Sequence, residues 1–329
     1  MARLILGRLP ALLGVLLALT FVVYLIDAVV PANPVAASLG AGASHAQIVA
    51  KEHQLGYDKP FYAQYWRFLE RVAHGDLGTS LRTHNTVASD LGRFAPATLE
   101  LALWSGVLII GLSLVLGVWS ASGVRGAGLV RAVMAGSAST PTFLASIALI
   151  LIFYSKLHLL PPSGRTSSGE ATGLVILEDF FSGKFNGMVG AIEHVIMPAF
   201  VVAVGPAVAI GRVLRGSLLE QMRQDHIRTA RSKGMGELSI IVRHALRNSA
   251  TPVLAMAGLQ MGLVLTGVIV VETVFAWPGL GLYASASLVN SDFPAVIGVT
   301  LVLGAAYVVI NAVVDVLQLL ADPRLREAR

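Results

Sequence analysis

The residues of this chain limit the chemistry that it could carry out. It contains no cysteine, so disulfides, thiolate metal sites and cysteine nucleophiles are excluded. It has no G-x-x-x-x-G-K-[ST] segment, so it does not bind ATP through a P-loop. His45, His53, His74 and His84 are scattered along one long polar segment without metal-site spacing. We interpret them as solvated loop histidines, with a metal or proton role as the alternative, and expect no bound cofactor or metal.

Four carboxylates fall within or beside apolar stretches, namely Asp27, Glu100, Glu272 and Asp315. Charge inside a membrane costs free energy, so these residues are functional candidates. The first three lie near the ends of apolar stretches, where a carboxylate can reach the membrane interface, which favours a structural role. Asn311 and Asp315 lie one helical turn apart and share a face. Their spacing favours hydrogen bonding between helices over a proton relay.

The segment 212–252 contains eight Lys or Arg residues and three acidic ones, yet long apolar runs flank it on both sides. Asp225–Lys233 predicts a helix that stops at Gly234, and Glu237 opens a second helix that continues through Arg247. The small Ala230 permits close packing of the pair. We expect Gly234 to adopt a left-handed backbone, which is inexpensive only for glycine.

Two interpretations of this polar segment remain open. Basic residues surround the turn: Arg228, Arg231, Lys233, Arg243 and Arg247. An electrostatic anchor to anionic lipid explains this charge, but it does not explain a glycine turn between two helices. A surface that docks onto a soluble partner explains both, and it indicates a transporter driven from outside the membrane.

Composition places these residues in a membrane protein. The 329 residues are 55% hydrophobic and only 13% charged, and the mean hydropathy is +0.73. A soluble domain carries about 25% charged residues. A spanning helix needs about 20 mostly apolar residues, and an α-helical bundle satisfies its own backbone groups. Six segments qualify as spans: Leu9–Val30, Ala97–Trp119, Arg131–Phe153, Ala191–Gly211, Pro252–Val271 and Ala295–Leu320.

The distribution of basic residues predicts the orientation. With both termini in the cytoplasm, fifteen of the 24 Lys and Arg residues lie inside. The first apolar run could be a signal peptide, because Ala41–Ala43 offers an A-x-A site. Its apolar core of about 20 residues is longer than a signal core, so we expect an uncleaved helix.

Three outer segments connect the spans. Pro31–Pro96 is too long for a bare loop, and Tyr62, Tyr65, Trp66 and Leu69 fall at helical spacing within it. We expect Tyr62, Tyr65 and Trp66 to bury one face together, either as a small core on the membrane surface or as a docking surface. The second segment has a short amphipathic piece at 174–181. The third, Glu272–Pro294, is rich in Gly and Pro and predicts a re-entrant or surface turn.

The segment IRTARSKGMGELSIIVRHALRNSATPVL resembles the cytoplasmic coupling (EAA) loop of ABC-importer permeases of the dipeptide/oligopeptide branch. Four further blocks are similar to the same branch, in the same order: LGYDKPFYAQYWRFLERVAHGDLGTSLRT, PATLELAL, VVETVFAWPGLGLYASASLVNSDFPAVIG and NAVVDVLQLLADPRLR. Arg228–Ala230 occupies the place of Glu-Ala-Ala, and Gly234 matches the motif glycine. The general Ile-x-Leu-Pro is replaced by His244-Ala-Leu246-Arg247, as is common in the peptide branch.

The resemblance implies the six-helix permease fold of an ABC type I importer, in a bacterial plasma membrane. It also implies that the chain is a non-catalytic subunit, paired with a second permease, two ATP-binding subunits and an extracytoplasmic peptide-binding protein. ATP would be bound by the partners, and no nucleic acid would be involved. The residues expected at the ATPase are Asp225, Arg228, Thr229, Ala230, Lys233, Gly234, Arg243, His244 and Arg247.

The expected organisation is a first membrane helix at 1–30, an extracytoplasmic segment at 31–96, a permease core at 97–320 and a cytoplasmic tail at 321–329. The same branch includes importers of nickel and other small solutes, which stay open as an alternative. A proton-coupled secondary carrier is a more distant one, because no convincing carboxylate or histidine pair falls at mid-membrane and no inverted repeat is seen.

Overall fold

The computed structural model describes residues 9–29, 39, 44–55, 59–122, 124–137, 140–165 and 173–321. Within these ranges the fold is all-α, and only an isolated bridge joins Thr79 to Thr86. The main helices are α2 (Leu9–Val29), α4 (His45–Leu55), α5 (Phe61–Ala73), α6 (Val87–Ala121), α7 (Ala127–Ser137), α8 (Thr142–Leu149), α9 (Val175–Phe181), α10 (Phe185–Gln221), α11 (Asp225–Ser232), α12 (Glu237–Ile240), α13 (Leu246–Asn248), α14 (Ala250–Val274), α15 (Leu280–Val289) and α16 (Phe293–Ala321). Two π-helical segments, η1 (Ile150–Lys156) and η2 (Ile241–Ala245), continue α8 and α12.

Four of the described helices, α6, α10, α14 and α16, are long and apolar enough to cross a membrane. The shortest, α14, has 25 residues and is therefore about 37 Å long, which exceeds the roughly 30 Å of hydrocarbon. α10 is the central helix and packs against α6 on one side and α14 on another. Its buried side chains, such as Val201, Ala203 and Ala207, form the core of the bundle.

The expected continuous span Arg131–Phe153 is wrong. α7 ends at Ser137, α8 begins at Thr142, and Pro141 precedes it with an extended backbone (φ −60°, ψ 140°). Proline lacks an N–H and disfavours the helical conformation of the residue before it. The apolar run is therefore divided into two helices at this proline.

The helix α2 packs against α16, and α5 packs on the C-terminal half of α2. Phe21 and Tyr24 of α2 make edge-to-face ring contacts with Phe61 and Tyr65 of α5. The Tyr65 hydroxyl also donates to the Leu17 carbonyl oxygen at 3.0 Å. The outer segment therefore forms a small aromatic core with the first helix.

The expectation that Tyr62 and Trp66 belong to this core is wrong. These side chains are 73% and 70% exposed, whereas Phe68 is 3% exposed. Residues 61, 65 and 68 follow the i, i+4, i+7 spacing of one helix face, which excludes positions 62 and 66. The helical period was correct, but the buried face is displaced by one residue.

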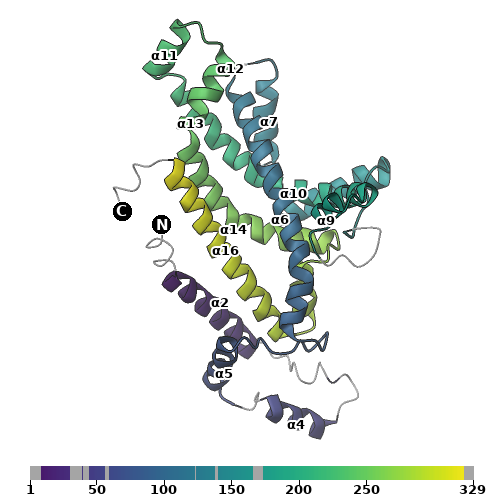
Figure 1. Cartoon of the computed structure of the whole chain (residues 1–329). Coiled ribbons are helices and arrows are strands. Elements are labelled where there is room, and N and C mark those ends of the chain that lie inside the picture. The colour runs from purple at the N-terminus through teal and green to yellow at the C-terminus, as the bar shows by residue number, and fades with distance from the viewer. Residues whose placement is uncertain are drawn as a thin grey trace.

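The two ends of the molecule differ. Figure 1 shows α11 and α12 at one end and α4 and α5 at the other. The start of α2 and the end of α16 both lie on the side away from α4. The polar helical pair is thus held apart from the outer segment by the length of the spanning helices.

Candidate functional site

We call α11 and the helical stretch 237–248 the inner pair, after the cytoplasmic side that the sequence predicts for them. The first helix of the pair, α11, is held by a small apolar cluster. Ile227 (0% exposed) and Ala230 (8%) face Ile240 (0%) of α12, with Met222 and Met235 around them. The small side chain of Ala230 lets the two helices approach, as the sequence predicted. The polar residues of α11 point outward as a consequence.

The turn between the two helices is a Schellman motif. The Gly234 N–H donates to the Arg231 carbonyl oxygen at 3.0 Å, and the Met235 N–H donates to the Ala230 carbonyl oxygen at 3.3 Å. This pattern requires a left-handed residue after the helix, and Gly234 has φ +79°. Met235 packs in the same cluster as Ala230, which is the apolar contact that accompanies the motif. The predicted left-handed glycine is confirmed.

An ion pair spans this turn. Arg231 Nε lies 2.6 Å from Glu237 Oε1, and a second guanidinium nitrogen lies 3.1 Å from Oε2. This hydrogen bonding lowers the pKa of the Glu237 carboxyl and raises the pKa of the Arg231 guanidinium. Both side chains are about half exposed, so the pair orients the turn and adds little to stability.

The second helix is continuous from Glu237 to Asn248, with the π-helical η2 in its middle. Ile241 and Ala245 bury against Leu214 and Leu218 of α10. The inner pair therefore packs directly against the central spanning helix.

The structure brings the predicted coupling residues to one end of the molecule but gives them different exposures. Exposed side chains or backbone are found at Asp225, Arg228, Thr229, Lys233, Gly234, Arg243 and Arg247, while His244 is half-buried and Ala230 is buried. Arg228 lies 3.5 Å from Asp225 one turn earlier, and both are almost fully exposed. Most of the set thus forms a polar surface, and Ala230 supports it from beneath.

Sequence reasoning missed two residues of this surface. Leu238 is 70% exposed and Val242 is 56% exposed, one turn apart on the second helix. An exposed apolar pair in a polar segment is costly in water and is typical of a contact site. The signal was available as an i, i+4 apolar pair outside the expected spans. We call Leu238, Val242 and the exposed polar residues around them the inner surface.

At the opposite end of the molecule, buried polar contacts hold the loops that the sequence predicts to lie outside. The Glu272 carboxylate accepts hydrogen bonds from the Thr98 hydroxyl at 2.7 Å and from the Gly281 N–H at 2.6 Å. It therefore binds the free N–H groups at the start of α15. A Cβ atom on Gly279 would overlap this carboxylate, which explains the glycine there. Glu272 has the structural role that its position suggested.

Glu100 anchors a second outer loop. Its carboxylate lies 2.6 Å from the Arg165 guanidinium and accepts the Ile176 N–H at 2.8 Å, and both members of the ion pair are buried. The Arg165 guanidinium also lies 6.0 Å from the ring centre of Trp277, whose indole N–H donates to the Ala97 carbonyl oxygen at 2.8 Å. The N-terminal half of α6 therefore binds two loops, one that contains Arg165 and one that contains Trp277.

Two further buried carboxylates hold the turn 80–85, and the sequence did not single them out. Asp292 accepts the Ser80 hydroxyl and the Leu81 N–H, the latter at 3.0 Å. Asp90 accepts the Thr83 hydroxyl at 2.5 Å and the Tyr283 hydroxyl at 2.9 Å. The contacts of Asp292 with Ser80 and of Asp90 with Tyr283 join residues 212 and 193 positions apart, so these two are tertiary and leave no local signal.

For the other polar residues predicted in or beside the spans, and for a metal site, the structure shows fewer contacts. The side chain of Asp27 lies outside the described residues. Asn311 donates to the Tyr307 carbonyl oxygen of its own helix at 2.9 Å, rather than to another helix as expected. Among the described residues no group of three or more His, Cys, Asp or Glu side chains could hold a metal ion.

Comparisons with known proteins show the family of the chain. A family described as "Binding-protein-dependent transport system inner membrane component" matches residues 113–327, and its N-terminal counterpart matches residues 1–102. The chain is 37% identical to a probable D,D-dipeptide transport system permease protein of Escherichia coli K12, over 92% of both chains. It is 34% identical to a dipeptide transport system permease protein of Alkalihalophilus pseudofirmus, over 97% of this chain and 98% of that one. It is also 34% identical to a di/tripeptide transport system permease protein of Pseudomonas aeruginosa, over 98% of both.

Proposed function

Because the chain belongs to the family of binding-protein-dependent transport system inner membrane components, we propose that it is a permease subunit of an ATP-driven importer for di- and oligopeptides. It forms half of the translocation path and pairs with a second, similar permease. Two ATP-binding subunits attach on the cytoplasmic side, and a soluble peptide-binding protein delivers substrate outside. The chain itself carries out no bond chemistry.

The observation that supports coupling most strongly is the construction of the inner surface. An exposed apolar pair and a ring of basic side chains lie on two short helices whose angle is set by the Gly234 turn. These helices rest on α10 through Ile241 and Ala245. A lipid anchor needs only the charge, whereas a docking surface also needs a fixed shape. The fixed turn therefore favours docking onto a folded partner.

The mechanism follows from this connection. When ATP closes the partner subunits, the inner surface moves with them and carries α10. α10 packs against α6 and α14, so the spanning bundle switches between outward and inward access. The docking contact supplies the difference in interaction free energy that biases the two states.

Peptides are favoured as the substrate because the relatives above are named for dipeptide, di/tripeptide and D,D-dipeptide transport. The chain covers nearly the whole length of each of them. Nickel is the alternative substrate from the same branch, and an uptake assay in cells distinguishes it from peptide. Cells that lack the chain should lose uptake of labelled Ala-Phe and keep uptake of labelled Ni²⁺, and plasmid expression should restore the peptide uptake. If the cells lost only Ni²⁺ uptake, the substrate would be the metal ion and not a peptide.

Partners and orientation are tested separately. A tagged chain purified in mild detergent should bring down two ATP-binding polypeptides and a second permease. A single Asn290→Cys change in this cysteine-free chain should react with an impermeant thiol reagent on intact cells, and Ser232→Cys should not. Both positions are exposed, so accessibility within the protein does not explain a difference. If only the Ser232→Cys variant reacted, the chain would have the opposite orientation in the membrane.

A further inference from the structure

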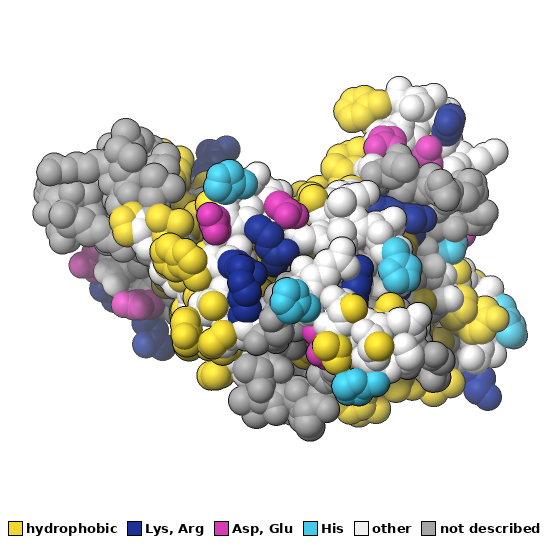
Figure 2. All heavy atoms as spheres, turned by 90° about the horizontal axis from the view of Figure 1, so that it is seen from below, with side chains coloured by type: hydrophobic (Ala, Val, Ile, Leu, Met, Phe, Trp, Pro, Cys, Tyr) yellow, Lys and Arg dark blue, Asp and Glu magenta, His cyan; other side chains and the backbone are white. Residues whose placement is uncertain are grey.

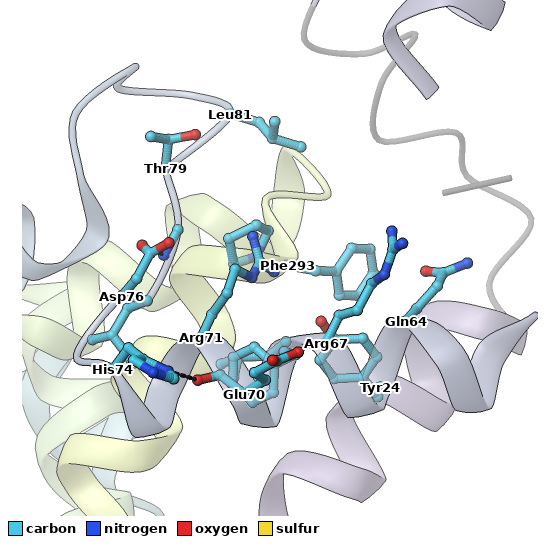
Figure 3. Close-up of a pocket in the computed structure, with 15 residues that line it drawn as sticks. Tyr24, Gln64, Arg67, Glu70, Arg71, His74, Asp76, Thr79, Leu81 and Phe293 are labelled. Carbon is cyan, nitrogen blue, oxygen red and sulfur yellow. Dashed lines mark hydrogen bonds between the residues drawn. The ribbon is translucent and has the colours of Figure 1, made fainter. Parts of the chain in front are cut away.

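A cavity of about 460 Å³ lies at the outer end of the chain, between α5 and the start of α16. Its lining includes Arg67, Glu70, Arg71, Asp76 and Phe293. Figure 3 shows Arg67 and Arg71 projecting from α5 on the same side as Phe293. Figure 2, which views the molecule from this end, shows basic, acidic and histidine side chains gathered close together.

The helix α5 presents three faces, and the cavity borders its arginine face and the adjoining Phe68. Phe68 and its neighbours pack on α2, and Tyr62 and Trp66 are exposed on another face. Arg67 and Arg71 lie one turn apart on the third face, which borders the cavity. Exposed Trp and Tyr suit a membrane interface, so lipid would meet the aromatic face. The arginine face instead meets solutes that arrive from the aqueous side.

The charges in the cavity are separated rather than paired. Among the described residues no ion pair engages Arg67, Arg71, Glu70 or Asp76. Arg71 and Asp76 nevertheless both approach Gly78. A Cβ at Gly78 would lie 3.9 Å from an Arg71 guanidinium nitrogen, and the Gly78 N–H donates to Asp76 Oδ1 at 2.8 Å. Positive and negative groups thus lie near one another on exposed side chains, and one oxygen of Asp76 is already bonded to the Gly78 N–H.

This arrangement selects a ligand that carries both signs of charge. A simple anion would meet two carboxylates, and a simple cation would meet two guanidinium groups. Arginine binds carboxylate through charge-assisted hydrogen bonds, and carboxylates accept from an ammonium group. Phe68, Phe293 and Ile297 add an apolar wall for a side chain. An extended dipeptide spans about 7 Å, which a cavity of this volume accommodates.

We propose that this outer cavity binds the free ammonium and carboxylate ends of a short peptide. Arg67 and Arg71 hold the carboxylate, Glu70 and Asp76 hold the ammonium group, and Phe293 contacts a side chain. The inference rests on peptide import as the proposed function. It adds to that function a receiving site on the permease itself, at the junction between the α2–α5 arm and the core.

The test measures binding of Ala-Phe to the full chain in lipid nanodiscs by calorimetry. Binding should be saturable, and N-acetyl-Ala-Phe-amide, which has the same side chains without the two charges, should bind at least tenfold more weakly. Arg71→Gln should weaken Ala-Phe binding by about 10- to 100-fold, because charge-assisted hydrogen bonds are lost. Lys184→Gln removes another exposed outer charge away from the cavity and should leave binding unchanged. Melting curves of both variants verify folding.

Equal binding of the free and the capped dipeptide, or no effect of Arg71→Gln, would overturn the inference. Loss of Ala-Phe binding when phosphatidylglycerol is added to the nanodisc would also overturn it, in favour of a lipid headgroup site. Uptake of labelled Ala-Phe by cells separates the two proposals. Normal uptake without binding in nanodiscs refutes only the cavity site, whereas absent uptake with the wild-type chain refutes peptide import.

Discussion

The Glu272 carboxylate of α14 accepts a hydrogen bond from the Thr98 hydroxyl of α6 at 2.7 Å, across 174 residues of sequence. The same carboxylate accepts from the Gly281 and Leu282 N–H groups at 2.6 and 3.2 Å. One buried side chain thus joins two spanning helices and the start of α15.

Glu272→Ala should therefore destabilise the chain strongly. Three donors would lose their acceptor, and each buried unsatisfied group costs about 1–3 kcal/mol. The melting temperature in detergent should fall clearly, and the amount of folded chain in the membrane should fall with it. Glu193→Ala, which removes an exposed carboxylate from the start of α10, is the matched control and should have little effect. Equal melting of both variants would show that the Glu272 contacts carry no stability.

The aromatic contact between α2 and α5 gives a second prediction. Phe68→Ala should cost about 3–5 kcal/mol, because it removes a buried ring and leaves a cavity. Trp66→Ala should cost less than about 0.5 kcal/mol, because the Trp66 side chain is exposed. Thermal unfolding followed by circular dichroism compares the two. A larger loss of stability for Trp66→Ala than for Phe68→Ala would mean that the buried face of α5 is the one that the sequence suggested.

The apolar pair of the inner surface should dominate the contact with the ATP-binding subunits. Leu238→Ala combined with Val242→Ala should weaken their association at least tenfold, because buried anchors supply most of an interface's binding energy. Leu259→Ala removes an equally exposed leucine from α14 and is the control. Quantitative copurification measures the effect. If the double variant still bound the ATP-binding subunits as the wild-type chain does, the apolar pair would not contribute, and the charged side chains alone would account for docking.

The ion pair across the turn predicts a pH dependence. Arg231 lowers the pKa of the Glu237 carboxyl, so its stabilising contribution is present above the usual carboxyl pKa. The contribution is lost as the pH falls through the lowered pKa. Amide exchange of residues 225–248, corrected for the intrinsic effect of pH, should therefore rise in acid. Glu237→Gln cannot titrate and should show no such rise; identical profiles would mean that the pair does not order the turn.

Much of the inner surface could be predicted because its signals are local. A glycine after a helix, followed by a new helix start, determines the turn at Gly234 through backbone sterics alone. The lengths of the apolar runs predicted α6, α10, α14 and α16 in the same way. The break at Pro141 had a local signal too, because proline disfavours a helix before it, but the long apolar run on both sides favoured a continuous span.

The outer anchors could not be predicted because they are tertiary contacts. Nothing near Glu100 in the sequence indicates Arg165, and nothing near Asp90 indicates Tyr283. Which of two adjacent faces of α5 is buried depends on where α2 lies, so helical periodicity alone did not decide between Tyr65 and Trp66. Leu238 and Val242 were visible in the sequence, but their exposure was not.

The central claim is that the Gly234 turn fixes a docking surface, and one pair of substitutions tests it. Gly234 has φ +79°, which a β-branched residue resists, whereas Gly236 has φ −68° and ψ 148°, which valine adopts readily. A Cβ at either position would meet no atom within 4 Å, so the two changes differ only in backbone strain. Gly234→Val should reduce copurified ATP-binding subunits at least tenfold and abolish Ala-Phe uptake, while membrane insertion stays normal. Gly236→Val should resemble the wild-type chain. Full uptake and full association with Gly234→Val, matching Gly236→Val, would contradict the account.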